Sequence, residues 1–157
     1  MAFRDVAHAT NARTAIAAVL PAGAVAGHTA TIERTPGARP AWLAHALCAV
    51  FDSFVFDWLV RQKASTHLSL YLLATVPMPG LDDAALRGLA AASARLHAAR
   101  GADAPARAWI DAVVARGYGL SRSEYAAVLD SFPNMPGLGG GDILLSTFDS
   151  ISLLYAA

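Results

Sequence analysis

Residues 40–63, PAWLAHALCAVFDSFVFDWLVRQK, carry the strongest secondary-structure signal in the chain. Bulky apolar residues recur there at helical spacing, and the proline at the start suits a first helical turn because its missing N–H needs no partner. Ser53, Asp57 and Arg61 follow one another every four residues on the opposite side, where Asp57 and Arg61 form a favourable pair. The pattern predicts one long core helix over residues 41–62.

Before this stretch, the sequence predicts short strands. Residues 3–8, 13–20 and 26–33 contain alternating or β-branched residues and are separated by turn residues. The alanines of 13–20 leave a helix as the alternative there. After the long helix, the apolar run 68–76 predicts a further, mostly buried strand that ends at a Pro/Gly-rich turn.

The second half of the chain predicts helices. The Ala-rich segment 81–100 begins with two aspartates, whose charge suits the positive end of a helix dipole, and a second helix spans 106–116. Ser121 followed by Glu124 has the spacing of a capping box, which opens a third helix. The apolar tail 143–155 is compatible with either a strand or a helix.

Together these elements predict an α+β fold, in which a small mixed or antiparallel sheet packs on a long central helix and a helical subdomain follows. The α/β core covers residues 1–80, the helical subdomain 81–133, and a loop with an apolar tail 134–157. The length of 157 residues fits one domain with a small appended subdomain.

Composition excludes several classes of protein. Charged residues are 15% of the chain and hydrophobic residues 55%, which excludes a disordered tail. The apolar stretch 41–60 carries His45, Asp52 and Asp57, which argues against a membrane span. The 12 basic and 12 acidic side chains cancel, which argues against indiscriminate nucleic-acid binding. The lone Cys48 suits a reduced, buried thiol in a cytoplasmic protein.

Motif analysis finds no catalytic or metal-binding constellation. The glycines at 137–141 lack a Walker lysine, and no Gly-x-Ser-x-Gly nucleophile elbow occurs. The five histidines have no ligand spacing and Cys48 stands alone, so the sequence predicts no metal site. We therefore expect no catalytic residues in this chain.

Polar side chains gather near the predicted ends of elements in the first half of the chain. Arg, Lys, Gln, Thr and His are the residue types that bind phosphates and read base edges. Composition alone favours a simpler interpretation, a solvated rim. The candidate DNA-binding residues are Arg4, Arg13, Thr14, His28, Thr29, Arg61, Gln62, Lys63, His67 and Ser69.

Blocks of sequence spread over roughly residues 3–133 resemble a known family in their order. The blocks are RDVA, TNARTAIAAVLP, GHT, LCAVFDSFVFDWLVRQK, HLS, YGLS and LDSFP. They resemble the C-terminal target-recognition region, the TaqI-like specificity domain, of adenine-specific restriction–modification methyltransferases. Asp52 and Ser69 depart from the pattern, since the family usually has Asn at both positions.

The resemblance implies a DNA target-recognition domain that binds duplex DNA sequence-specifically and has no catalytic residues of its own. Arg and Lys of the candidate set would hold phosphates, and the other side chains would read bases in the major groove. The partner would be an upstream methyltransferase domain that carries S-adenosylmethionine and flips an adenine into its pocket. This chain, which lacks that catalytic half, is then expected to be a fragment without a cofactor.

The sequence leaves a second function open, a structural or protein-interaction module that docks a methyltransferase or endonuclease partner. Pairing of the Ala-rich helices into a homodimer also stays open. Both interpretations expect a cytoplasmic protein that does not enter a membrane. The DNA interpretation requires that the ends of the early strands and of the long helix meet on one cationic surface.

Overall fold

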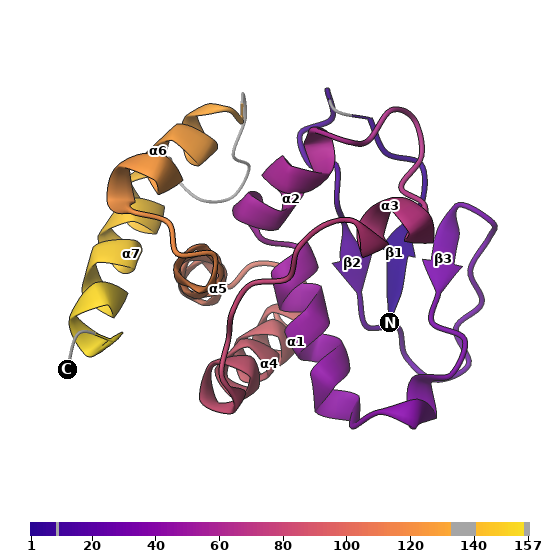
Figure 1. Cartoon of the computed structure of the whole chain (residues 1–157). Helices are drawn as coiled ribbons and strands as arrows, with labels where there is room; N and C mark the ends of the chain where they lie inside the picture. The colour runs from indigo at the N-terminus through magenta and orange to yellow at the C-terminus, as the bar shows by residue number, and fades with distance from the viewer. Residues whose placement is uncertain (9, 133–140, 156–157) are drawn as a thin grey trace.

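The computed structural model describes residues 1–8, 10–132 and 141–155, with side chains as far as Ile151. Three strands form an antiparallel sheet in the order β2 (Ala17–Ala18), β1 (Ala2–Arg4) and β3 (Ala30–Ile32). The described residues also form seven α-helices, most of which lie beyond the β2 edge of the sheet (Figure 1). The α+β class that the sequence predicts is confirmed, and the sheet is smaller than expected.

The predicted long helix is wrong, because two helices occupy its place. Helix α1 (Ala41–Phe51) and helix α2 (Phe54–Arg61) meet at a bend of 64°. Ser53 caps α2 by accepting a hydrogen bond from Phe56 N at 3.3 Å. Apolar residues continue through the break, so the hydrophobic period alone does not reveal it. The Ser53 cap marks the start of the new helix.

The length and composition of the helices bear on whether one of them could cross a membrane. Among the described residues, no single helix is long and apolar enough to cross a membrane. Helices α1 and α2 taken together reach that length and composition, but they are bent against each other and mostly buried in the protein.

The predicted strand over 68–76 is also wrong. Leu68 is fully buried, and its N–H donates to Asp5 O at 2.7 Å, but a short helix α3 (Leu70–Ala74) follows at once. Ser69 caps this helix through Leu72 N. An apolar run of this length has no decisive period, and the serine cap decides in favour of a helix.

The helices predicted for the second half are confirmed, with boundaries that shift by a few residues. They are α4 (Asp83–Ala98), α5 (Ala104–Gly117) and α6 (Arg122–Asp130), and the ambiguous tail forms α7 (Gly141–Tyr155). The capping box of Ser121 and Glu124 is present as predicted. Helix α4 packs on α1, and α5 lies between α4 and α7 (Figure 1).

One hydrophobic core joins all three segments that the sequence distinguishes. Its buried members run from Phe3 in the sheet through Phe54, Leu89 and Val113 to Ile151 in the last helix. Helices α4 and α5 approach closely at Gly88, where an added Cβ would lie 2.6 Å from the Trp109 ring. The helical half therefore packs directly on the half that contains the candidate DNA-binding residues.

Candidate nucleic-acid interface

Three segments that are distant in sequence meet at the end of strand β1. Asp5 N donates to Thr29 O at 2.8 Å, and Ala7 N donates to Thr66 O at 3.1 Å. We call the surface formed by residues 5–8, 27–29 and 62–69 the strand-end edge; it lies at the top of the sheet in Figure 1. Six of the ten candidate residues belong to this edge and are exposed, namely His28, Thr29, Gln62, Lys63, His67 and Ser69.

Most exposed side chains of the strand-end edge make weak local contacts. Lys63 Nζ donates to Thr75 O at 3.1 Å and to Thr75 Oγ1 at 3.0 Å. His67 Nδ1 lies 3.1 Å from Asp5 Oδ2, and Gln62 Nε2 donates to the carbonyl of Trp58 at 3.3 Å. Exposed contacts of this kind exchange readily with water or with a phosphate, so these side chains are available to a ligand.

Arg13 and Thr14 occupy a different environment. The carboxylate of Asp57, which is 0% exposed, accepts hydrogen bonds from Arg13 Nε at 2.6 Å, from Thr14 N at 3.0 Å and from Ala15 N at 3.1 Å. Arg61 Nε lies 3.6 Å from the same carboxylate. We call these five residues the Asp57 cluster.

Arg61 of this cluster and one further arginine, Arg4, hold the carbonyl groups of the same loop. Arg61 Nη2 donates to Asn11 O and to Ala12 O, each at 2.7 Å. Arg4 Nη2 donates to Arg13 O at 2.7 Å. These guanidinium groups therefore fix the backbone of residues 11–13 instead of projecting into solvent.

The structure thus divides the ten candidate residues into two groups. Thr14 is fully buried, and Arg4, Arg13 and Arg61 bind backbone carbonyls or Asp57, so these four stabilise a loop in this conformation. A position near the end of an element does not show whether a side chain turns inward or outward, which is why the sequence grouped all ten. The sequence pattern assigned the Asp57–Arg61 pair to the polar side of the helix, opposite the apolar residues. In the structure that side of the helix is buried.

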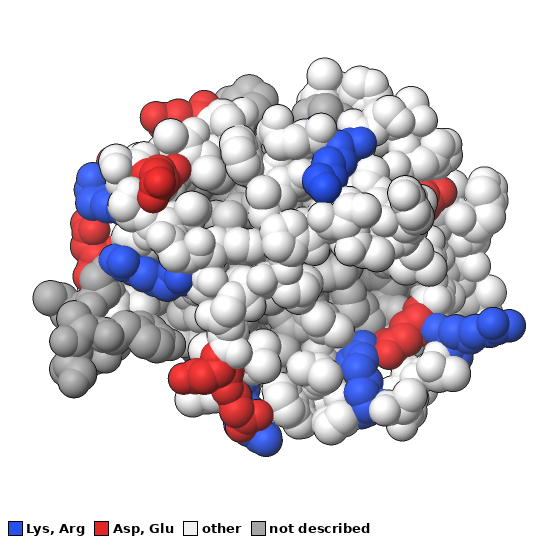
Figure 2. Space-filling model, viewed as in Figure 1, with Lys and Arg blue, Asp and Glu red and all other residues white. Residues whose placement is uncertain are grey.

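Surface charge is mixed on the face shown in Figure 2. Lys and Arg side chains lie among Asp and Glu side chains, with wide uncharged areas between them. No extended area of positive charge appears on this face. The predicted convergence at the strand-end edge is present in the backbone, but the charge of Arg4, Arg13 and Arg61 is directed inward.

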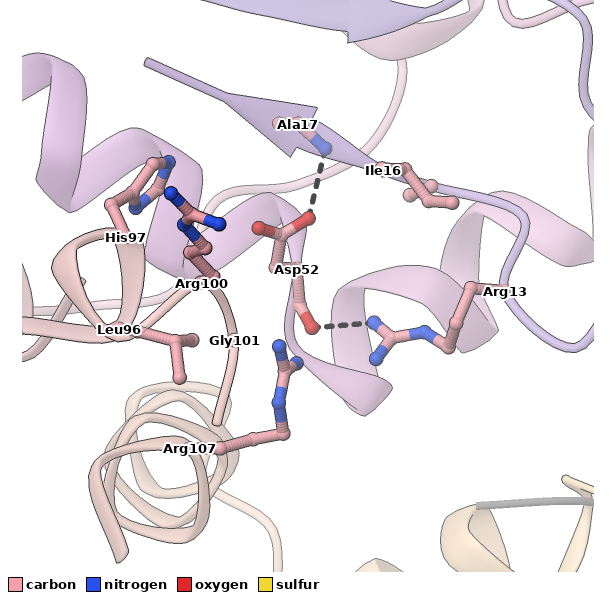
Figure 3. Close-up of a pocket in the computed structure, with 10 residues that line it drawn as sticks. Arg13, Ile16, Ala17, Asp52, Leu96, His97, Arg100, Gly101 and Arg107 are labelled. Atoms are coloured by element: carbon pink, nitrogen blue, oxygen red, sulfur yellow. Dashed lines mark hydrogen bonds between the residues drawn. The ribbon is translucent and has the colours of Figure 1, made fainter. Parts of the chain in front are cut away.

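A second cluster of arginines lies on the other side of the loop that carries Arg13. The guanidinium groups of Arg13, Arg100 and Arg107 converge around Asp52 (Figure 3). They line a cavity of about 360 Å³ between strand β2, the end of α1, the end of α4 and the first turns of α5. We call this cavity the arginine pocket.

Two of these guanidinium groups have no acceptor among the described residues. Within the described part of the chain, neither Arg100 nor Arg107 makes a side-chain hydrogen bond or an ion pair. Arg100 has φ of 51° and precedes Gly101 with φ of 85°, in a turn where Gly101 N donates to Leu96 O at 2.8 Å. This left-handed turn ends helix α4 and directs Arg100 toward the pocket.

His97 connects the pocket wall to the sheet. His97 Nδ1 lies 2.8 Å from Ser93 O, and since a carbonyl only accepts, this nitrogen carries the proton. Nε2 is then the acceptor for Val19 N at 3.1 Å. Both ring nitrogens are thereby engaged, so His97 positions the end of strand β2 and is not free to bind a ligand.

Two carboxyl groups near the arginines are unusually hard to ionise. Burial raises the pKa of Asp52 from 3.8 to about 6, although Ala17 N and Arg13 favour its charged form. Burial likewise raises the pKa of Asp111 to about 6. Asp111 Oδ1 accepts a hydrogen bond from Phe54 N at 2.7 Å, and its other oxygen has no partner among the described residues.

The raised pKa predicts that Asp52→Asn stabilises the protein at neutral pH. A folded-state pKa above the ordinary value means that this group's contribution to stability is full below 3.8 and is lost as the pH rises through about 6. Asn keeps an acceptor for Ala17 N without the charge. Because Asp52 borders an open pocket, we expect a gain of about 1–2 kcal/mol above pH 7.

Urea unfolding of both proteins between pH 4 and pH 8 measures this difference. The gap between Asp52→Asn and wild type is expected to close toward the acidic end. A variant that is less stable than wild type at every pH would show that the Asp52 carboxylate is favourable where it lies.

Sequence reasoning did not identify Arg100 and Arg107 as members of a site. They lie in the Ala-rich half, where single arginines among alanines are typical of a solvated helix face. Only the packing of α4 and α5 against the end of α1 brings them to Asp52. Among the described residues, no group of three or more His, Cys, Asp or Glu side chains is placed to hold a metal ion.

Comparisons of the chain with protein-family models, with curated proteins and with solved structures find no match.

Proposed function

We propose that this chain binds duplex DNA and recognises its sequence, as the target-recognition module of an adenine-specific restriction–modification methyltransferase. The proposal gives the chain no catalytic residues. The methyl donor, S-adenosylmethionine, and the reacting adenine would belong to a separate methyltransferase domain, and the assembly would work in the cytoplasm.

One observation carries this proposal. The blocks of sequence that resemble the family lie far apart in the chain, yet residues 5–8, 27–29 and 62–69 form one continuous edge through backbone hydrogen bonds. Exposed His28, Lys63 and His67 lie on that edge. Side chains of these types bind phosphates and read base edges, and loops at one edge of a sheet are a common place for binding residues.

The Asp57 cluster supports the proposal by making the adjoining loop rigid. Its carboxylate binds Thr14 N and Ala15 N, while Arg61 holds the carbonyls of Asn11 and Ala12. A recognition loop that is ordered before binding loses less conformational entropy when it meets DNA. Arg13 and Arg61 then contribute to recognition through the shape of the loop.

Selection from a pool of random duplexes tests the proposal. The folded protein is mixed with the pool at low salt, bound duplexes are recovered and sequenced, and the affinity of the enriched duplex is measured against salt concentration. We expect one enriched sequence and a binding constant that falls steeply as salt rises, since phosphate contacts release counterions. Enrichment of no sequence would overturn sequence-specific recognition.

Lys63→Ala is expected to weaken binding to every duplex by a few-fold. Removing one phosphate contact lowers the slope of log K against log salt by about one. The matched control is Arg122→Ala, because Arg122 is exposed and ion-paired with Asp149 on helices α6 and α7. Equal affinities of Lys63→Ala and wild type at low salt would remove Lys63 from the interface.

The competing function is docking of a methyltransferase or endonuclease, and the exposed apolar residues Leu70 and Tyr71 favour it. Their relative exposures are 66% and 84%. Single exposed apolar residues are common on protein surfaces, so this observation is weaker than the convergence at the strand-end edge. A folded protein that binds no duplex at low salt would decide for docking.

A further inference from the structure

We infer that the arginine pocket is a phosphate-binding site. The inference does not depend on the proposed DNA recognition, because the pocket lies apart from the exposed side chains of the strand-end edge. It rests on a cavity of about 360 Å³ and on two guanidinium groups, those of Arg100 and Arg107, that lack acceptors among the described residues.

The charge of the pocket favours an anion. Arg13, Arg100 and Arg107 contribute three positive charges, against which Asp52 and Asp111 contribute two negative charges when both are ionised. Asp57 and Arg61 form a further pair of opposite sign. The four arginines and three aspartates named here sum to one positive charge when all three carboxyl groups are ionised.

The geometry also separates the arginines by role. Arg13 is fixed by Asp57 and by the carbonyls of Asp52 and Ser53, so it supplies charge but few free N–H groups. Arg100 approaches from the turn after α4 and Arg107 from α5, and their planar N–H groups remain available (Figure 3). Two guanidinium groups that converge on one space match the several oxygens of a phosphate.

Arg107 is half-buried at the pocket wall. Its side chain is partly removed from water yet finds no acceptor in the described protein. No nitrogen of Arg107 is among the buried atoms that lack a partner, so its N–H groups stay accessible from the pocket. A phosphate in the cavity would accept charge-assisted hydrogen bonds from these N–H groups.

Two sources could supply the phosphate. One is a phosphodiester of the DNA backbone, which would extend the duplex contact beyond the strand-end edge. The other is inorganic phosphate or a phosphomonoester. The chemistry of the contact is the same in both cases, so the inference concerns the phosphate group, and the experiment separates its sources.

The test uses the whole chain and the double variant Arg100→Gln, Arg107→Gln. Gln keeps most of the length and polarity of Arg but removes the charge, and the left-handed backbone at position 100 is equally strained in both proteins. Arg122→Gln is the matched control on a distant helix. Binding of inorganic phosphate and of a short duplex is measured by titration calorimetry, and circular dichroism melting checks that each variant folds.

We expect wild type and Arg122→Gln to bind alike and the double variant to bind at least about tenfold more weakly, since bonds to charged groups are the stronger ones. If the double variant loses affinity for the duplex, the site binds a backbone phosphate. If it loses affinity for inorganic phosphate alone, the site binds the free anion. Wild type that binds neither probe, or a folded double variant that retains the affinity of wild type for every probe bound, would overturn the inference. Phosphate binding without duplex binding would contradict the proposed function and leave this site standing.

Discussion

Replacement of Asp57 by Ala is expected to lower the free energy of unfolding by about 3–5 kcal/mol. The carboxylate is fully buried and accepts hydrogen bonds from Arg13 Nε, Thr14 N and Ala15 N. Its removal leaves two buried N–H groups and a half-buried guanidinium without their acceptor. Leaving such groups unpaired costs more than the intact network contributes, which makes this one of the most damaging substitutions in the chain.

Urea unfolding followed by circular dichroism measures the loss. Asp83→Ala is the matched control, because Asp83 is 69% exposed and forms a surface pair with Arg87 on α4. We expect that control to change stability by less than about 1 kcal/mol. Asp57→Asn should fall between the two variants, since its carbonyl still accepts from the loop while its amide faces Arg13. Unfolding midpoints that coincide for Asp57→Ala and wild type would show that the cluster does not stabilise the fold.

The second large effect is expected from Phe54→Ala, which should cost about 3–5 kcal/mol. Phe54 is 1% exposed at the start of α2 and meets Phe132 edge to face, with ring centroids 4.8 Å apart. The Arg13 guanidinium lies 4.5 Å from the centroid of the same ring. Truncation therefore opens a cavity and removes two aromatic contacts in one step.

Tyr71→Ala provides the comparison for Phe54→Ala, since Tyr71 is aromatic but 84% exposed on α3. Its loss should change stability by no more than about 0.5 kcal/mol. Thermal melting of the two variants beside wild type distinguishes them. A Phe54→Ala protein that melts with wild type would mean that the core collapses around the missing ring without cost.

Both substitutions also bear on function through the loop that carries Arg13. This loop contributes one wall of the arginine pocket and adjoins the strand-end edge. If the Asp57 cluster orders the loop, Asp57→Asn should weaken phosphate and duplex binding even where the protein remains folded. The effect would come through position, because Asp57 is buried and touches no ligand.

Much of the helical half could be predicted from the sequence. The N-caps of α4, α5 and α6 are Asp82, Asp103 and Ser121, whose side chains accept hydrogen bonds from the first turn. These signals are local, because a cap and its partner lie three residues apart. The α+β class was likewise predictable from apolar periodicity, since the short strands precede the helices.

The directions of side chains in the first half were predicted less well, for one physical reason. Asp57 and Thr14 are separated by 43 positions, and nothing near Asp57 in sequence reveals that its carboxylate binds that loop. The same kind of distant contact turns Arg4, Arg13 and Arg61 inward. The sequence placed these side chains correctly at the ends of elements and predicted that they point into solvent. Three of them, the arginines, instead point inward and hold carbonyl groups.

Local sequence thus sets where most helices begin and end and which residues can enter a core, because these properties depend on neighbours within one or two turns. The inward arginines and the pocket of Arg100 and Arg107 arise only when elements pack. Burial of a charged group depends on which distant surface covers it, and that surface exists only in the folded protein.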